Sequence, residues 1–210
     1  MKKVDLKKGL KHLYNPSTKE PATVDVPDMN FIMIDGAGDP NTAQEFQDAV
    51  ATLYALSYTL KFMIKRGKTT VDYTVMPLEG LWWADDITQF SMEDKGLWKW
   101  TVMIMQPDYV TRDLYDEAFK QVQKKKNPPA LSKSRFQNWR EGLSAQIMHI
   151  GPYSAEGPTI EKLHRFISEG GYKLTGKHHE IYLSDPRKSA PERMKTVIRQ
   201  PLQRKAIEPT

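Results

Sequence analysis

Lys177-His178-His179-Glu180-Ile181-Tyr182-Leu183 is the stretch around which the chain is organised. Ile181 and Leu183 alternate with Glu180 and Tyr182, and successive side chains of a strand leave opposite faces of a sheet. A glycine precedes the stretch and an Asp-Pro pair follows it, and both are turn signals. We therefore predict a strand with an apolar back and a front that carries a carboxylate and a phenol. A solvated strand face is the simpler alternative.

The composition is that of a soluble globular protein. With 210 residues the chain can form one large domain or two small ones. No run approaches the roughly 18 apolar residues of a membrane span, and the N-terminus lacks the apolar core of a signal peptide. The absence of cysteine excludes disulfides, a thiolate nucleophile and Cys-based zinc sites. We expect a cytoplasmic protein of a prokaryote-like cell with no membrane partner.

The basic charge is not arranged for nucleic-acid binding. A net charge of +5 would allow such a partner, but the basic residues gather near the ends and in one linker. Solvated charge is the usual explanation of such runs, which are Lys2-Lys3, Lys7-Lys8, Lys124-Lys125-Lys126 and the tail from Arg187 to Lys205. No helix-turn-helix or RNA-binding signature is present. We expect no nucleic-acid partner.

Hydrophobic periodicity divides the chain into helices and strands. Apolar residues recur at helical spacing in 42–64, 110–126 and 158–167, and the first of these helices has a capping box made by Thr42 and Glu45. Extended or alternating patterns predict strands over residues 31–34, 69–76, 98–105, 143–150, 177–183 and 194–200. The Pro-ended run from Lys124 to Pro129 is the strongest linker signal.

The order strand, helix, strand, strand occurs twice, once in residues 30–106 and once in residues 144–201. The closing strands Thr101–Pro107 and Thr196–Pro201 resemble each other, and in this pairing the Glu180 strand corresponds to the strand that starts at Val71. We predict an α+β fold in which 1–210 form one domain of two pseudo-symmetric repeats. These repeats, about 22–107 and 143–202 and joined by a helix and linker, would form a curved antiparallel sheet with helices on one face. A ligand cleft is expected at their seam.

Other chemical motifs are poorly supported. The glycines of residues 35–40 lack P-loop spacing and the dinucleotide fingerprint. The segment Gly142–Gln146 lacks the second glycine of a nucleophile elbow. His178 and His179 point to opposite faces of a strand, so they do not form a metal site with His149 or His164. We expect no cofactor and no metal.

Two turn motifs and two tryptophan-containing segments carry a family resemblance. His149-Ile150-Gly151-Pro152-Tyr153 and His179–Pro186 resemble the GyrI-like small-molecule-binding family, which also supplies the ligand domains of multidrug-sensing transcription regulators. Pro77–Trp83 and Trp98-Lys99-Trp100 further resemble its stand-alone cytoplasmic branch, and the chain has no DNA-binding helical domain. The resemblance implies an aromatic pocket with an acid at its base and affinity for lipophilic, planar or cationic compounds. Some stand-alone members open the cyclopropane ring of DNA-alkylating natural products.

The resemblance also implies roles for particular residues. Glu180 matches the pocket glutamate, and opening an electrophilic ring with water needs a base for the water and a donor for the developing charge. We expect Glu180 to be the base, with Glu79 or Tyr153 as the helper. The residues expected to bind ligand are Tyr182, Trp82, Trp83, Trp98, Trp100, Tyr54 and Tyr58.

Three function classes and two packing alternatives stay open. The chain could be a ring-opening hydrolase, a module that sequesters or senses drugs without turnover, or, from the family name alone, an inhibitor of a topoisomerase. Trp98 and Trp100 could instead fill the core, and Tyr54 and Tyr58 could pack against the sheet edge. The oligomeric state is not indicated.

Overall fold

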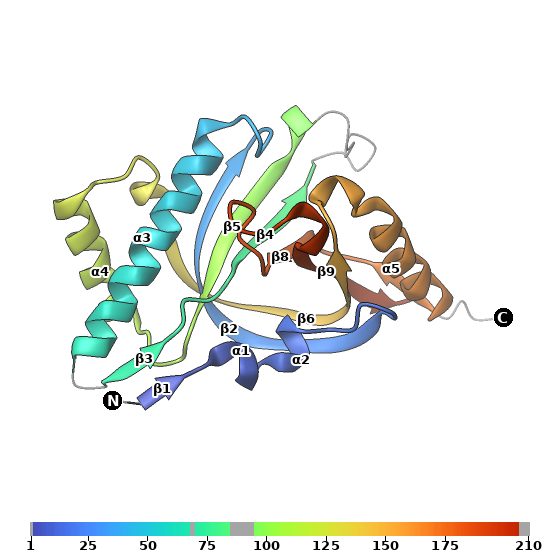
Figure 1. The fold of residues 1–210 in the computed structure, drawn as a ribbon, viewed down its shortest axis with the longest axis horizontal. Helices are drawn as coiled ribbons and strands as arrows, with labels where there is room; N and C mark the ends of the chain where they lie inside the picture. The colour runs from blue at the N-terminus through green and yellow to red at the C-terminus, as the bar shows by residue number, and fades with distance from the viewer. Residues whose placement is uncertain (1, 68–69, 85–94, 206–210) are drawn as a thin grey trace. The chain divides into compact units, whose positions relative to one another are not determined.

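The structure is a computed structural model that describes residues 2–67, 70–84 and 95–205. Packing divides the chain into two compact units, each made of two segments. The first unit comprises Met1–Gly9 and Met29–Trp139, and the second comprises Leu10–Asp28 and Arg140–Thr210. Helices and mainly antiparallel strands make up both units, so the predicted α+β class is confirmed (Figure 1).

The elements follow in chain order. Those of the N-terminal part are β1 (Lys2–Val4), α1 (Leu6–Gly9), α2 (Lys11–Tyr14), β2 (Ala22–Ala37), α3 (Gln44–Arg66), β3 (Val71–Tyr73), β4 (Leu78–Trp83), η2 (Lys95–Leu97), β5 (Lys99–Gln106) and α4 (Arg112–Lys125). They are followed by η3 (Leu131–Lys133), β6 (Arg135–Ile150), η4 (Tyr153–Ala155), α5 (Gly157–Glu169), β7 (Tyr172–Leu174), β8 (His178–Tyr182), η5 (Pro191–Arg193) and β9 (Lys195–Arg204). Strands β2 and β6 each contribute residues to both units.

In the first unit, helix α3 covers one face of the antiparallel strands β2, β5 and β4. Trp82 lies opposite Trp100 in the β4–β5 register, so the two side chains share a sheet face. The ring of Phe46 stacks on Trp82 at 5.8 Å and meets the edge of Trp100 at 5.2 Å, which places α3 over this face (Figure 1). The core of this unit is therefore aromatic at one end of α3.

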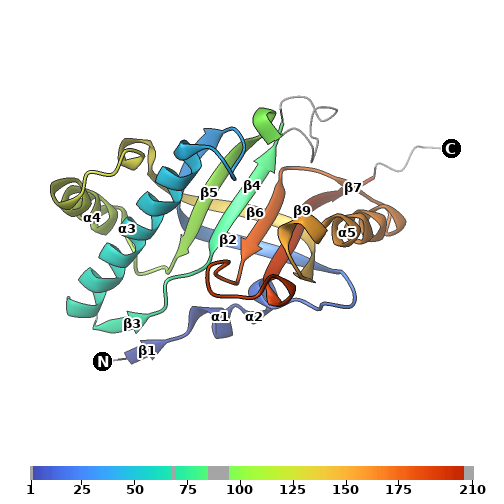
Figure 2. The same ribbon diagram turned by 45° about the horizontal axis from the view of Figure 1, so that its top comes forward.

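In the second unit, helix α5 covers one face of the antiparallel strands β6, β9 and β8. Ile147 and Ile198 lie opposite each other and pack with Leu163 and Ile167 of α5. Glu180 is also opposite Ile198, so its side chain leaves the sheet on the α5 side. Figure 2 shows α5 beside the β7 and β9 end of this unit.

The predicted repeat is confirmed, but one strand correspondence is wrong. The strands and helix of the two repeats are β2-α3-β3-β4-β5 and β6-α5-β7-β8-β9, so each repeat has one short strand, β3 or β7, beyond the predicted order. The counterpart of β8 is β4, because each pairs with the closing strand of its own repeat. The strand from Val71 ends at Tyr73 and pairs in parallel with β1. A few residues later, Pro77 has no N–H for a ladder, and β4 begins directly after it.

Two element boundaries differ from expectation. The first helix begins at Gln44, with Ala43 as an extended cap that makes no side-chain hydrogen bond, so the capping box at Thr42 does not form. The Asp39 carbonyl instead accepts the N–H groups of Thr42 and Ala43 in a turn. Strand β6 begins at Arg135 rather than at 143, because the polar residues before 143 bond to strand β2. One such contact is the ion pair between Arg135 and Asp35 at 2.8 Å.

No helix within the described ranges is long and apolar enough to cross a membrane.

Candidate functional site

Strand β8 presents a hydrogen-bonded row of polar side chains on the α5 side of its sheet. His178, Glu180 and Tyr182 alternate with the buried His179 and Ile181, as the sequence predicted for the glutamate and the tyrosine. The Tyr182 hydroxyl donates to Glu180 Oε2 at 2.7 Å, and His178 Nε2 lies 3.2 Å from Oε1. The Glu180 side chain is 15% exposed, so solvent still reaches a carboxylate that is otherwise enclosed. We call this row the Glu180 row.

Tyr153 meets the Glu180 row from the turn that follows β6. Its ring centroid lies 5.5 Å from that of Tyr182, edge to face, and its side chain remains partly exposed. The turn depends on Gly151, whose φ of 142° disfavours other residues. A Cβ at Gly151 would also lie 3.0 Å from His149 Nε2. The His149–Tyr153 motif therefore fixes where the Tyr153 ring stands.

Two further imidazoles adjoin the row. Burial lowers the pKa of His149, although a backbone hydrogen bond to Pro152 and the charge of Glu180 act to raise it. His149 Nδ1 forms a hydrogen bond with Thr159 Oγ1 of α5 at 2.9 Å. Burial also lowers the pKa of His164, and the nearby His178 adds to that shift. Both shifts favour the neutral form of these two imidazoles.

A buried charged cluster lies on the opposite face of the same strands, and the sequence analysis missed it. Glu141 accepts hydrogen bonds from His179 Nδ1 at 2.9 Å and from Arg199 at 3.0 Å, and each of the three side chains is 1% exposed. Burial alone would raise the pKa of Glu141, but the charges and hydrogen bonds of His179 and Arg199 outweigh it and lower the pKa to about 2. The available signal was a charged residue at a core-facing position of β9, where Arg199 shares a face with Val197.

Three of the predicted tryptophans cluster near Phe46 in the first unit, where Glu79 lies on the other face of the sheet. Glu79 is fully buried, opposite Met103, and points away from α3. Trp82 and Trp100 point toward α3, and Trp98 meets the edge of the Trp82 ring at 5.5 Å. Glu79 and Glu180 therefore differ in placement, because only Glu180 faces the helix of its own unit.

The remaining aromatic candidates differ in exposure. Trp100 is fully buried with its ring against Gly36, as the core-filling alternative expects. Trp83 is partly buried at the end of β4. Tyr54 and Tyr58 lie one turn apart on α3 with ring centroids 6.3 Å apart, and Tyr58 is exposed.

The structure thus brings together Glu180, Tyr182 and Tyr153 within one unit. Sequence reasoning did not assign His178 to the site, although its position two residues before Glu180 on a strand was the available signal. Glu79 and the tryptophans belong to the other unit and stay separate candidates.

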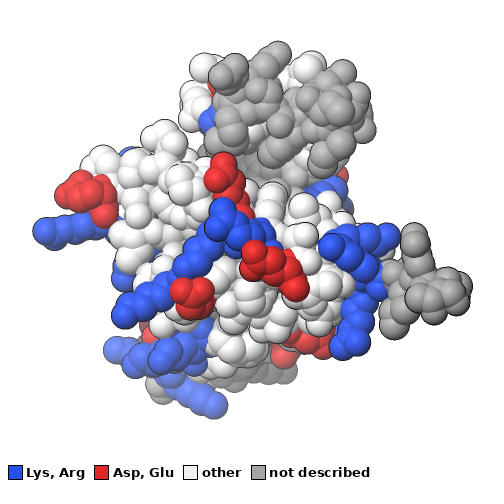
Figure 3. Space-filling view, turned by 90° about the vertical axis from the view of Figure 1, so that its right-hand side faces the viewer, with Lys and Arg blue, Asp and Glu red and all other residues white. Residues whose placement is uncertain are grey.

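Charge and metal chemistry add little to the site. In the part of the chain that the structure describes, no group of three or more His, Asp or Glu side chains is arranged to hold a metal ion. On the face shown in Figure 3, basic and acidic side chains are intermixed.

Comparisons with known proteins identify the relatives of the chain. The model of the GyrI-like small-molecule-binding domain matches residues 19–203. An uncharacterized conserved protein from Listeria innocua is 43% identical, with 95% of this chain and 100% of that chain covered and a TM-score of 0.88. A hydrolase from Listeria innocua is 41% identical, with 95% and 100% covered and a TM-score of 0.83. The EcmrR C-terminal domain shares the fold, with a TM-score of 0.52 and 12% identity. The match covers 88% of this chain and 98% of that domain. No curated protein matches the chain.

Proposed function

We propose, since the chain belongs to the GyrI-like family of small-molecule-binding domains, that the Glu180 row binds lipophilic, planar or cationic compounds and hydrolyses reactive cyclopropane-bearing toxins. The observation that carries this proposal is the carboxylate of Glu180, held between Tyr182 and His178 and only slightly exposed. A relative that is 41% identical over nearly the whole chain is named a hydrolase, which favours turnover.

The geometry suits recognition of a cation on a planar body. An enclosed carboxylate attracts positive charge more strongly than one in bulk water, because the surrounding dielectric is lower. The rings of Tyr182 and Tyr153 meet each other edge to face next to this carboxylate. Aromatic faces favour stacking with planar groups and attract cations. These interactions need no chemistry, so they serve a binding protein as well as an enzyme.

Hydrolysis would use the same groups in a balanced step. The oxygen of a water molecule bonds to a cyclopropane carbon while one ring C–C bond breaks. The electron pair of the broken C–C bond moves into the electron-withdrawing part of the substrate. Glu180 takes the proton of the attacking water. Tyr153 stabilises the developing negative charge by donating a hydrogen bond, and a proton from solvent completes the product. Glu79 remains a second candidate for the helper.

The test is Glu180→Gln, which keeps the size of the side chain and removes its charge and basicity. We expect turnover of a cyclopropane-bearing alkylator, followed by mass spectrometry of the water adduct, to fall by about 10²–10⁴-fold. Binding of an uncharged planar analogue should stay within a few-fold of the parent. Glu161→Gln, which makes the same substitution on the exposed side of α5, is the matched control and should leave turnover unchanged.

Two outcomes would overturn parts of the proposal. Hydrolysis by Glu180→Gln at the parent rate would remove Glu180 from the reaction. The alternative of a non-catalytic drug-binding or sensing module holds under three results together. The parent binds a cationic dye stoichiometrically, Glu180→Gln binds the dye more weakly, and the parent forms no water adduct.

A further inference from the structure

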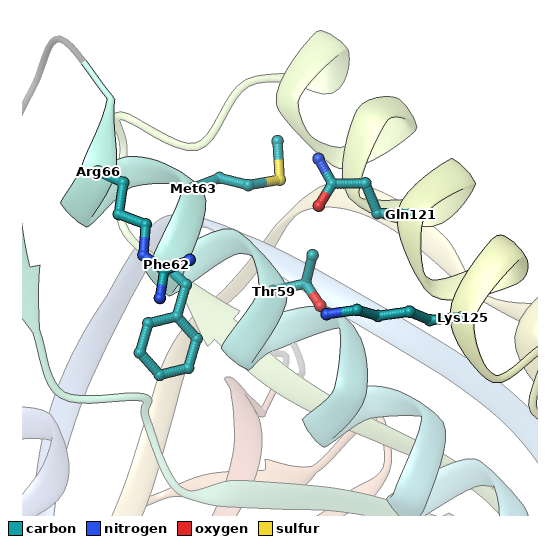
Figure 4. A pocket seen from close by; sticks show the side chains of 6 residues that line it. All are labelled: Thr59, Phe62, Met63, Arg66, Gln121 and Lys125. Atoms are coloured by element: carbon teal, nitrogen blue, oxygen red, sulfur yellow. The ribbon is translucent and has the colours of Figure 1, made fainter.

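A groove between the C-terminal halves of α3 and α4 lies wholly within the first unit. It has a volume of about 450 Å³, within the range of small-molecule sites. Figure 4 shows its lining side chains, which are Thr59, Phe62, Met63 and Arg66 from α3, and Gln121 and Lys125 from α4. We call it the α3–α4 groove.

The groove combines an apolar wall with two cations. The ring of Phe62 is 44% exposed, unusually open for a large apolar side chain, and the half-buried Met63 lies one residue further. The Arg66 guanidinium stands 5.6 Å from the Phe62 ring centroid (Figure 4). Lys125 adds a second positive charge from the other helix.

These two cations are not neutralised, in contrast to two lysines of α3. Lys61 and Lys65 of α3 both pair with Asp72, at 3.5 and 2.7 Å. Within the described residues, Arg66 and Lys125 have no carboxylate within ion-pair distance. Glu117 accepts a hydrogen bond from the side-chain amide of Gln121 at 3.1 Å.

The helix ends explain only part of this charge. Cations are favoured at helix C-termini, but each macrodipole is equivalent to about half an elementary charge. Arg66 lies in the last turn of α3, and Lys124 and Lys125 lie in that of α4, so their positive charge exceeds what the two dipoles offset.

We propose that the α3–α4 groove binds an anionic amphiphile, a small molecule with an aromatic or aliphatic body and one carboxylate or sulfonate. The body lies against Phe62 and Met63, and the anion is held between Arg66 and Lys125. An arginine stacked on a ring offers its planar edge to a carboxylate, which permits two parallel hydrogen bonds. This preference is opposite in charge to that of the Glu180 row and does not depend on it.

The experiment titrates the full chain, labelled with ¹³C-methyl methionine, with 2-naphthoate. The Met63 methyl signal is assigned by its loss in Met63→Leu. We expect 2-naphthoate to shift this signal in a saturable manner, and the uncharged 2-naphthalenemethanol to bind at least 10-fold more weakly. Lys125→Glu and Arg66→Glu should each weaken 2-naphthoate binding at least 10-fold.

The matched control is Lys124→Glu, which makes the same charge change one residue away and outside the lining of the groove. It should leave the affinity within about twofold, and Glu180→Gln should leave it unchanged. An unshifted Met63 signal, equal binding of the uncharged compound, or an equal loss in Lys124→Glu would each overturn the proposal. None of these results bears on the Glu180 row.

Discussion

At the residue scale, Glu141 shows how a buried charge is made tolerable and what its removal should do. Two cationic or polar partners bind the carboxylate, and together they hold its pKa near 2 against the opposing effect of burial. We expect Glu141→Gln to lower the free energy of unfolding by about 3–5 kcal/mol at pH 7, because it leaves the buried Arg199 without its counter-charge. Urea unfolding measures this loss, and Glu161→Gln on the exposed side of α5 should change little.

The same carboxylate makes the loss depend on pH. The folded-state pKa of Glu141, about 2, lies below its ordinary value of 4.5, so its stabilisation is present above pH 4.5 and is lost as the pH falls toward 2. That shift corresponds to roughly 3 kcal/mol. The stability gap between the parent and Glu141→Gln should therefore narrow from pH 5 to pH 3. A gap that stays constant over this range would show that the buried cluster does not titrate in this way.

At the element scale, strand β2 is shaped by the tryptophan that crosses it. Gly36 lies opposite Trp100 in the β2–β5 register, and the fully buried indole ring occupies the space where a Cβ would be. Gly36→Ala must displace that ring, so we expect a loss of about 1–3 kcal/mol or more in the free energy of unfolding. Gly9→Ala is the control, since a Cβ there has no atom within 4 Å. Equal urea midpoints for the two variants would show that Trp100 is not tightly packed.

The elements differ in how much of them the sequence could predict. The ends of helices α4 and α5 were predicted to within two residues, because an apolar stripe at helical spacing is a local signal. Strand β4 was not recognised, because Leu78–Trp83 is almost continuously buried and does not alternate. The polar start of β6 was not predicted, because its partners lie 100 residues away.

The candidate site likewise contains some features that local sequence predicts and others that depend on long-range contacts. The alternation of Glu180 and Tyr182 was visible locally and is confirmed as strand geometry. The contact of Tyr153 with Tyr182 needs the turn at Gly151, and the Glu141 cluster joins positions 38 and 58 residues apart. Contacts of this kind depend on strand pairing, which periodicity alone does not specify.

At the scale of the whole molecule, the two units are interleaved along the chain, so no single cut separates them. The second unit takes its segment Leu10–Asp28 from the far end of the sequence. Three carbonyls of that segment accept hydrogen bonds from the strands of the unit. The His12 carbonyl accepts from the Gln146 side chain at 2.6 Å, and the Leu13 carbonyl accepts from the Arg199 side chain at 2.7 Å. The Ser17 carbonyl accepts from the backbone N–H of Met148 at 2.9 Å. Leu13 itself is fully buried.

A fragment of residues 140–210 should therefore fail to fold alone, because it lacks the apolar cover from Leu13 and leaves Arg199 with fewer partners. Adding a synthetic peptide of residues 10–28 should restore dispersed amide signals in the NMR spectrum of the fragment. The same peptide with Leu13→Asp should not do so, because a carboxylate would replace a fully buried apolar side chain. A dispersed spectrum from residues 140–210 without peptide would mean that the C-terminal repeat is self-sufficient. The N-terminal segment would then be an addition to this unit rather than part of its core.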